Sequence, residues 1–128
     1  CLLSPRPVKK DRYTQAFSIT DMVNRVKTGW DFALFMRLSD QTYPALVDLS
    51  KEMRKLNIPL YTYVLVGTPR NAEILKQIGW EPTTTINNVV NYVEKLDEIV
   101  DGVIATCAGD YQGDLEVLKA LNSKFRKR

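Results

Sequence analysis

The sequence contains no histidine, and its 128 residues include only two cysteines, Cys1 and Cys107. The lack of histidine excludes histidine acid–base catalysis and histidine metal ligands within this chain. No apolar run approaches the ~20 residues that span a bilayer, so we expect no transmembrane segment. The Gly-x-Gly-x-x-Gly and Gly-x-x-x-x-Gly-Lys-Ser/Thr motifs are both missing, so the sequence predicts no nucleotide cofactor.

The two cysteines have different interpretations. Cys107 lies in an apolar, strand-like run, where a free cysteine is usually a small buried hydrophobe. Cys1 matches the first residue of a processed bacterial lipoprotein, whose lipid anchor would tether the protein to a membrane on the periplasmic or extracellular side. The favoured interpretation is instead that the numbering starts partway along a longer chain, and a cytoplasmic location is then compatible.

Positive charge is concentrated at the two ends of the chain. The formal net charge is +3, but residues 1–12 carry +3 and residues 124–128 carry +4, which leaves −4 on the rest. We therefore predict an extended basic arm over residues 1–16, a single domain over residues 17–123 and a basic tail over residues 124–128. A nucleic-acid-binding domain would show a basic stripe on its folded face, so a protein partner or a small anionic ligand is the favoured partner.

Three apolar runs predict buried strands, over Asp31–Leu38, Leu60–Val66 and Val103–Cys107. The stretch Trp80–Ile86 contains three threonines but also Pro82, and it predicts a short edge strand. Helical patterns alternate with these strands, and such alternation is typical of a parallel sheet covered by helices. The predicted fold class is α/β, a three-layer sandwich with a mainly parallel sheet of the flavodoxin or Rossmann type. A thioredoxin-like layout without redox cysteines is the alternative.

Two helix starts bear on function. Thr68 is predicted as the N-cap and Pro69 as the first residue of a helix that follows the central strand. Asp114 is predicted to cap the last helix, whose inward residues would be Leu115, Leu118 and Leu121.

In an open parallel sheet, ligands bind beyond the carboxyl ends of the strands, where the strand order reverses. Three polar loops should meet there, over residues 39–42, 67–71 and 108–114. Gly67 allows a sharp turn, and Arg70 offers a forked cation for phosphate or carboxylate. The predicted ligand-binding residues are Ser39, Asp40, Gly67, Thr68, Arg70, Asn71 and Asp110.

An alternative interpretation of the same loops is a metal site formed by Asp40, Asp110 and Asp114, since carboxylates can hold Mg²⁺ for phosphoryl transfer. The segment from Leu38 to Leu46 resembles the Ser-Gly-Asp-x-Asp-Phe-x-x-Leu stretch of NYN/PIN-type ribonucleases, although Thr42 stands where the family has a second Asp. The resemblance implies a metal-dependent nuclease.

Sparse acids and the missing catalytic motifs argue mildly against a self-contained enzyme. The sequence therefore predicts a non-catalytic binding or assembly module that acts through its strand-end loops, and the nuclease remains the alternative.

Overall fold

The computed structural model describes residues 2–3, 7–9, 15–17 and 19–125, with side chains from Met22 onward. Cys1, most of the basic arm and the last three residues of the basic tail lie outside these residues, so the lipid anchor and the arm remain predictions. In the part of the chain that is described, no helix has the length and apolar character needed to cross a membrane.

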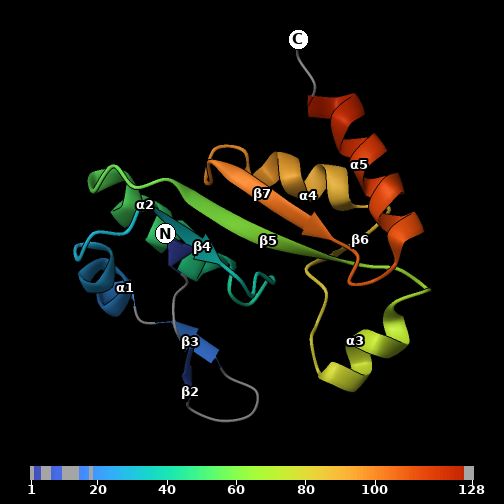
Figure 1. The fold of residues 1–128 in the computed structure, drawn as a ribbon, viewed down its shortest axis with the longest axis horizontal. Coiled ribbons are helices and arrows are strands. Elements are labelled where there is room, and N and C mark those ends of the chain that lie inside the picture. Colours follow the sequence, from blue (N-terminus) through green and yellow to red (C-terminus); the bar gives the residue numbers. More distant parts are fainter. Residues whose placement is uncertain (1, 4–6, 10–14, 18, 126–128) are drawn as a thin grey trace.

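Five parallel strands form the main sheet, and a separate antiparallel hairpin lies beside it (Figure 1). The main strands are β1 (Leu2–Leu3), β4 (Phe32–Phe35), β5 (Leu60–Gly67), β6 (Thr84–Thr85) and β7 (Gly102–Thr106). The hairpin consists of β2 (Pro7–Lys9) and β3 (Gln15–Phe17). The helices are α1 (Ile19–Val26), α2 (Tyr43–Lys55), α3 (Ala72–Ile78), α4 (Val89–Leu96) and α5 (Tyr111–Phe125).

The predicted fold class, α/β with a mainly parallel sheet, is confirmed. Strand β5 is central, because Tyr61 pairs with Leu34 of β4 on one side and with Gly102 of β7 on the other. The three strands predicted to run side by side in one direction do so, and their carboxyl ends therefore share one edge of the sheet. Leu2 pairs with Phe32, so the start of the chain also joins this sheet.

The chain changes direction across the sheet at β5. Strands β1, β4 and β5 follow one another in order, but the next strand, β6, returns to the β4 side. Thr83, just before β6, marks this return: its amide donates to the Leu65 carbonyl (2.8 Å) and its hydroxyl donates to the Leu38 carbonyl (2.6 Å). The chain then crosses to β7 on the far side of β5. This reversal is the kind of point at which open α/β sheets bind ligands.

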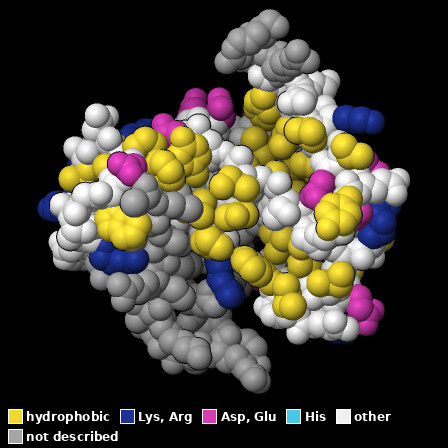
Figure 2. Space-filling view, in the orientation of Figure 1, with side chains coloured by type: hydrophobic (Ala, Val, Ile, Leu, Met, Phe, Trp, Pro, Cys, Tyr) yellow, Lys and Arg dark blue, Asp and Glu magenta, His cyan; other side chains and the backbone are white. Residues whose placement is uncertain are grey.

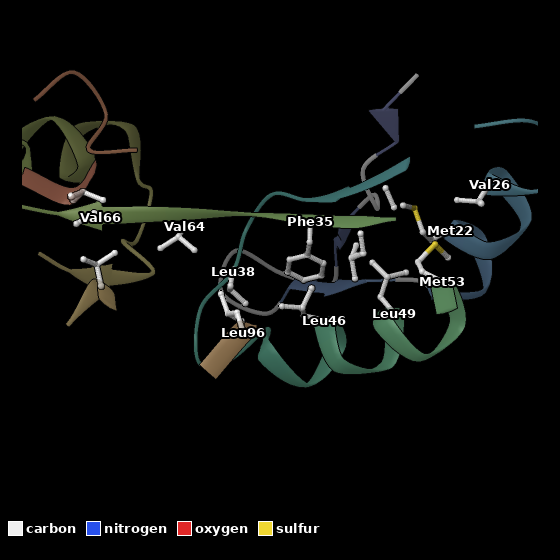
Figure 3. Close-up of a cluster of buried hydrophobic side chains, with 14 of the residues drawn as sticks. Met22, Val26, Phe35, Leu38, Leu46, Leu49, Met53, Val64, Val66 and Leu96 are labelled. Atoms are coloured by element: carbon white, nitrogen blue, oxygen red, sulfur yellow. The ribbon is translucent and has the colours of Figure 1, made fainter. Parts of the chain in front are cut away.

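One face of the sheet packs on helices α1, α2 and α4. In β5 every second side chain points to this face, as expected for a strand, and two of them, Val64 and Val66, are fully buried. Figure 3 shows Phe35 of β4 pointing toward Leu46 and Leu49 of α2. The apolar stripe predicted for α2 is therefore the one that forms the core.

Two predicted strands are too long. The run Asp31–Leu38 is a strand only over β4, and Trp80–Ile86 only over β6. The physical reason is that both lie along the same side of β5. Strand β4 pairs with its first half, at Leu60–Thr62, and β6 pairs with its end, at Val66 and Gly67.

The predictions for α5 need correction. The helix begins at Tyr111, and Asp110 takes the capping position, because its Oδ1 accepts a hydrogen bond from the Gly113 amide (3.0 Å). Asp114 lies inside the first turn instead. The inward side is formed by Gly113 and Val117, with Leu121 partly buried. Leu115 and Leu118, predicted to face inward, are more than half exposed.

Several large apolar side chains remain at the surface of α3, β7 and α5. Figure 2 shows hydrophobic side chains in this region of the molecule. Their exposure separates them from the core, although the helical spacing of Leu115 and Leu118 predicts that these two face inward. The exposed side chains are Ile74, Ile78, Ile104, Tyr111, Leu115 and Leu118.

Candidate functional site

Strand β5 leads into a tight polar turn at its carboxyl end. The Thr68 amide donates to the Asn71 side-chain oxygen (2.8 Å), and the Asn71 amide donates to the Thr68 hydroxyl (3.2 Å). Such reciprocal bonds between side chain and backbone satisfy both amides inside the turn. Helix α3 begins at Ala72, three residues later than predicted, and Pro69 lies in the turn.

Asn71 ties the ends of two strands together. Its side-chain amide nitrogen donates to the carbonyl of Val66 in β5 (2.9 Å) and to the carbonyl of Cys107 just after β7 (2.7 Å). Asn71 is fully buried, and its side-chain oxygen is also bonded. The residue was predicted as a ligand contact, but its polar groups hold the rim of the sheet in shape.

Asp110 is the centre of a second set of contacts, the Asp110 cluster, formed with Thr68, Arg70 and Gly113. The carboxylate accepts hydrogen bonds from the Thr68 hydroxyl (2.7 Å), from Arg70 Nε (2.8 and 2.9 Å) and from the Gly113 amide (3.0 Å). Its side chain is only 3% exposed. Burial alone would raise the pKa of Asp110, but the bonds from Arg70, Thr68 and Gly113 outweigh it and lower the pKa.

The loop before α5 aims Asp110 into this cluster. Ala108 and Gly109 both have positive φ, +46° and +92°, which turns the chain sharply after β7. Gly113 then allows a close approach: a Cβ atom at that position would lie 2.6 Å from Asp110 Oδ2 and 3.2 Å from Cys107 Sγ. The site therefore depends on a glycine inside a helix, where glycine is otherwise unfavourable.

Beside the Asp110 cluster lies a hollow of about 740 Å³, which we name the α3 hollow. This volume is in the range of sites that bind small molecules. Its walls are the end of β5, one side of α3 and the segment around β6. They consist of Gly67, Thr68, Pro69, Asn71, Ala72, Leu75, Lys76, Gly79, Trp80, Glu81, Pro82, Thr85, Ile86 and Asn87.

Five of the seven predicted ligand residues come together at the end of β5. Thr68, Arg70, Asn71 and Asp110 are joined by hydrogen bonds, and Gly67 lies in the wall of the α3 hollow. Ser39 instead belongs to its own turn, where its amide donates to the Thr42 hydroxyl (2.8 Å).

The other predicted acids are placed differently from Asp110. Asp40 lies near Tyr92, where its charge adds to the effect of burial and raises the pKa of Tyr92 to about 12. The Asp114 carboxylate accepts a hydrogen bond from the Cys107 amide (2.7 Å). Within the described residues, no three Asp, Glu or Cys side chains are grouped so as to hold a metal ion, so Asp40, Asp110 and Asp114 do not form the predicted alternative centre.

Arg70 is less available to an anion than the sequence suggests. Asp110 binds its Nε, and Glu116 lies 3.6 Å from its Nη2. The bond to Asp110 contributes most to raising the pKa of Arg70. Helix α3, which follows this turn, is only seven residues long, so its amino-terminal dipole also contributes little attraction for an anion. The strand-end residues therefore form a neutralised polar floor beside a mostly apolar hollow.

The residues that sequence reasoning missed are those of the outer wall, above all Lys76, Trp80 and Glu81. Trp80 follows the left-handed Gly79 that ends α3, and the guanidinium of Arg37 lies 5.0 Å from its ring centre. The only sequence signal was a tryptophan after a helix-ending glycine, which is equally typical of local packing.

No protein family matches the chain, and neither a curated protein nor a solved structure shows significant similarity to it. The class of protein is thus defined by the fold and the site: a small α/β protein with a hollow at the carboxyl end of its central strand.

We predict that Cys107 is unreactive in the folded protein. It is fully buried, and burial together with the charge of Asp114 raises the pKa of its thiol to about 11. The thiolate is the reactive form, so a Cys1→Ser variant should not react with Ellman's reagent at pH 8 until guanidinium unfolds it. The raised pKa also means that this group's contribution to stability is complete below pH 9 and is lost as pH rises toward 11. Rapid reaction of the native variant would contradict the prediction.

Proposed function

We propose that this protein is a non-catalytic binding module that engages a small ligand or a segment of a protein partner at the carboxyl ends of its strands. The observation that carries the proposal is the α3 hollow, which lies where the chain reverses across the sheet. Concave, mostly apolar sites with a few polar groups are typical of ligand pockets.

The surroundings of the hollow support recognition of an apolar body more than of a small anion. Apolar side chains from α3 and from the segment around β6 form much of its wall, including Leu75, Trp80 and Ile86. Arg70, the cation predicted for an anion, is bound to Asp110. A phosphate or sulfate would gain little from a cation whose charge is already balanced.

The alternative, metal-dependent phosphoryl transfer, has weaker support. It requires Asp40, Asp110 and Asp114 to act together. Both oxygens of Asp110 already accept hydrogen bonds from protein groups, and one oxygen of Asp114 accepts a hydrogen bond from the Cys107 amide. These oxygens are therefore less available to a metal ion. The alternative stays testable in the same experiment as the proposal.

The test is an amide NMR titration of the ¹⁵N-labelled protein with 1-anilinonaphthalene-8-sulfonate and, separately, with MgCl₂. The aromatic dye should shift the amides of the hollow wall, namely Gly67, Thr68, Ala72, Gly79 and Thr85. Shifts that avoid these amides would contradict the proposal. Magnesium shifts confined to Asp40, Asp110 and Asp114 would support the nuclease instead.

A matched pair of variants locates the dye. Ala72 lies in the hollow wall, so Ala72→Trp should fill the hollow and abolish the shifts. Gln77 is exposed on another side of α3 and is not part of that wall, so Gln77→Trp should leave the shifts in place. Equal effects of the two variants would argue against binding in the hollow.

A further inference from the structure

We propose that the ligand of the α3 hollow is a short apolar peptide with a free ammonium group and a free carboxylate. The inference rests on the proposed function, because it names the ligand class for the same site. It follows from two features of the wall, namely its apolar side chains and its pair of unmatched charges.

The apolar part of the wall comes from three successive segments. Pro69 precedes α3, Leu75 lies on the helix and is 3% exposed, and Trp80 follows it. Pro82 and Ile86 complete the wall on either side of β6. A volume of about 740 Å³ between such side chains suits a molecule with several apolar groups rather than an ion.

Lys76 and Glu81 bring opposite charges to this apolar wall. Lys76 lies in the last turn of α3, and Glu81 follows two residues after Gly79 ends the helix. Among the described residues, neither side chain forms an ion pair, with the other or with a third group. The wall thus offers a cation and an anion, both unmatched, and its net charge is zero.

A zwitterion complements this arrangement. Its carboxylate would pair with Lys76 and its ammonium group with Glu81, while its apolar side chains contact the rest of the wall. A simple carboxylate would leave Glu81 unmatched, and a simple amine would leave Lys76 unmatched. The complementary charges therefore select a ligand that carries both.

The wall also has polar groups for a peptide bond. Thr68 and Asn71 are occupied by the strand-end contacts, but Thr85 and Asn87 are exposed and belong to the same wall. A hydroxyl and a carboxamide can both donate and accept hydrogen bonds. They suit the N–H and C=O of a dipeptide or tripeptide better than they suit a hydrocarbon acid.

The test uses Trp80 as the reporter in a Trp30→Phe background, since Trp30 and Trp80 are the two tryptophans. Leucyl-leucine and its uncharged analogue, N-acetyl-leucyl-leucine amide, are titrated while the Trp80 emission is recorded. We expect leucyl-leucine to bind at least about tenfold more tightly than the analogue. Lys76→Gln and Glu81→Gln should each weaken leucyl-leucine about tenfold and leave the analogue unchanged.

Two charge-matched controls are available on exposed helix surfaces outside the hollow. Lys119→Gln on α5 and Glu73→Gln on α3 should not change either affinity. Equal binding of the two peptides, no effect of Lys76→Gln and Glu81→Gln, or no Trp80 response would each overturn the inference. The NMR titration then separates the two conclusions: dye binding in the hollow would keep the proposed function, and its absence there would overturn both.

Discussion

Asn71→Ala is expected to lower the free energy of unfolding by about 3–5 kcal/mol, the largest effect we predict. The side chain is fully buried and bonds three backbone groups, the Val66 and Cys107 carbonyls and the Thr68 amide. Alanine would leave the Val66 carbonyl and the Thr68 amide without this partner, at roughly 1–3 kcal/mol for each buried group, and would remove the shorter of the two bonds to the Cys107 carbonyl, which keeps the Asp110 amide (3.1 Å). In a domain of this size the melting temperature should fall by roughly 10–20 °C.

The control for Asn71 is Asn91→Ala, at an exposed position of α4, where a change within about 0.5 kcal/mol is expected. Asn71→Asp keeps the shape of the side chain but replaces the donor to both carbonyls with an acceptor, so it should also destabilise the protein. Urea denaturation followed by circular dichroism measures all three variants. A loss below about 1 kcal/mol for Asn71→Ala would show that Asn71 does not hold the two strand ends together.

Gly113→Ala should destabilise the protein by about 2 kcal/mol, although alanine normally gains about 1 kcal/mol over glycine inside a helix. The added Cβ would lie 2.6 Å from Asp110 Oδ2 and 3.0 Å from its Cγ, and Cys107 limits movement on the other side. The carboxylate would have to leave its bonds to Thr68 and Arg70. Thermal denaturation measures the stability, and amide shifts at Thr68 and Arg70 report the displacement.

The matched control is Ser123→Ala, at an exposed position of the same helix, where a small gain is expected from the higher helix propensity of alanine. If Gly113→Ala were as stable as this control, the close approach of Asp110 to the helix would not constrain the site.

The presence of three main strands and their common direction follow from the sequence, because continuous apolar runs such as Leu60–Val66 that alternate with helices indicate a parallel sheet. The ends of the strands do not. Asp31–Leu38 is apolar almost throughout, yet the chain stops pairing after Phe35, since β6 takes the rest of that side of β5. Which strand occupies an edge is decided by the whole sheet and not by the local run.

Helix faces were harder to predict where apolar residues occupy two sides. In α5, Leu115 and Leu118 have helical spacing, but so do Gly113 and Val117. The structure buries the second pair, because the small Gly113 permits the contact with Asp110 and Cys107. Sequence periodicity identifies the stripes and cannot choose between them without knowing what lies opposite.

The sequence predicted the part of the candidate site at the end of β5, but not the outer wall formed by α3 and the segment around β6. Thr68, Asn71 and Asp110 could be nominated, since polar residues after parallel strands meet at one edge. Their roles could not, because a buried asparagine that bonds two carbonyls has the same sequence signal as one that contacts a ligand. Lys76 and Glu81 lie on an ordinary helix and the turn after it, and only the path of the chain between β5 and β6 brings them to the hollow.

That path has a consequence for how such a protein can change over evolution. Residues 68–88 leave the central strand and return to it at only two paired positions, Val66 with Thr84 and Gly67 with Thr85. The strands β4 and β7, and the core between the sheet and α2, are built without this excursion. Beyond the Thr68–Asn71 turn, substitutions or insertions can change the wall of the hollow while the paired strands stay intact, so homologues should differ most over residues 72–88.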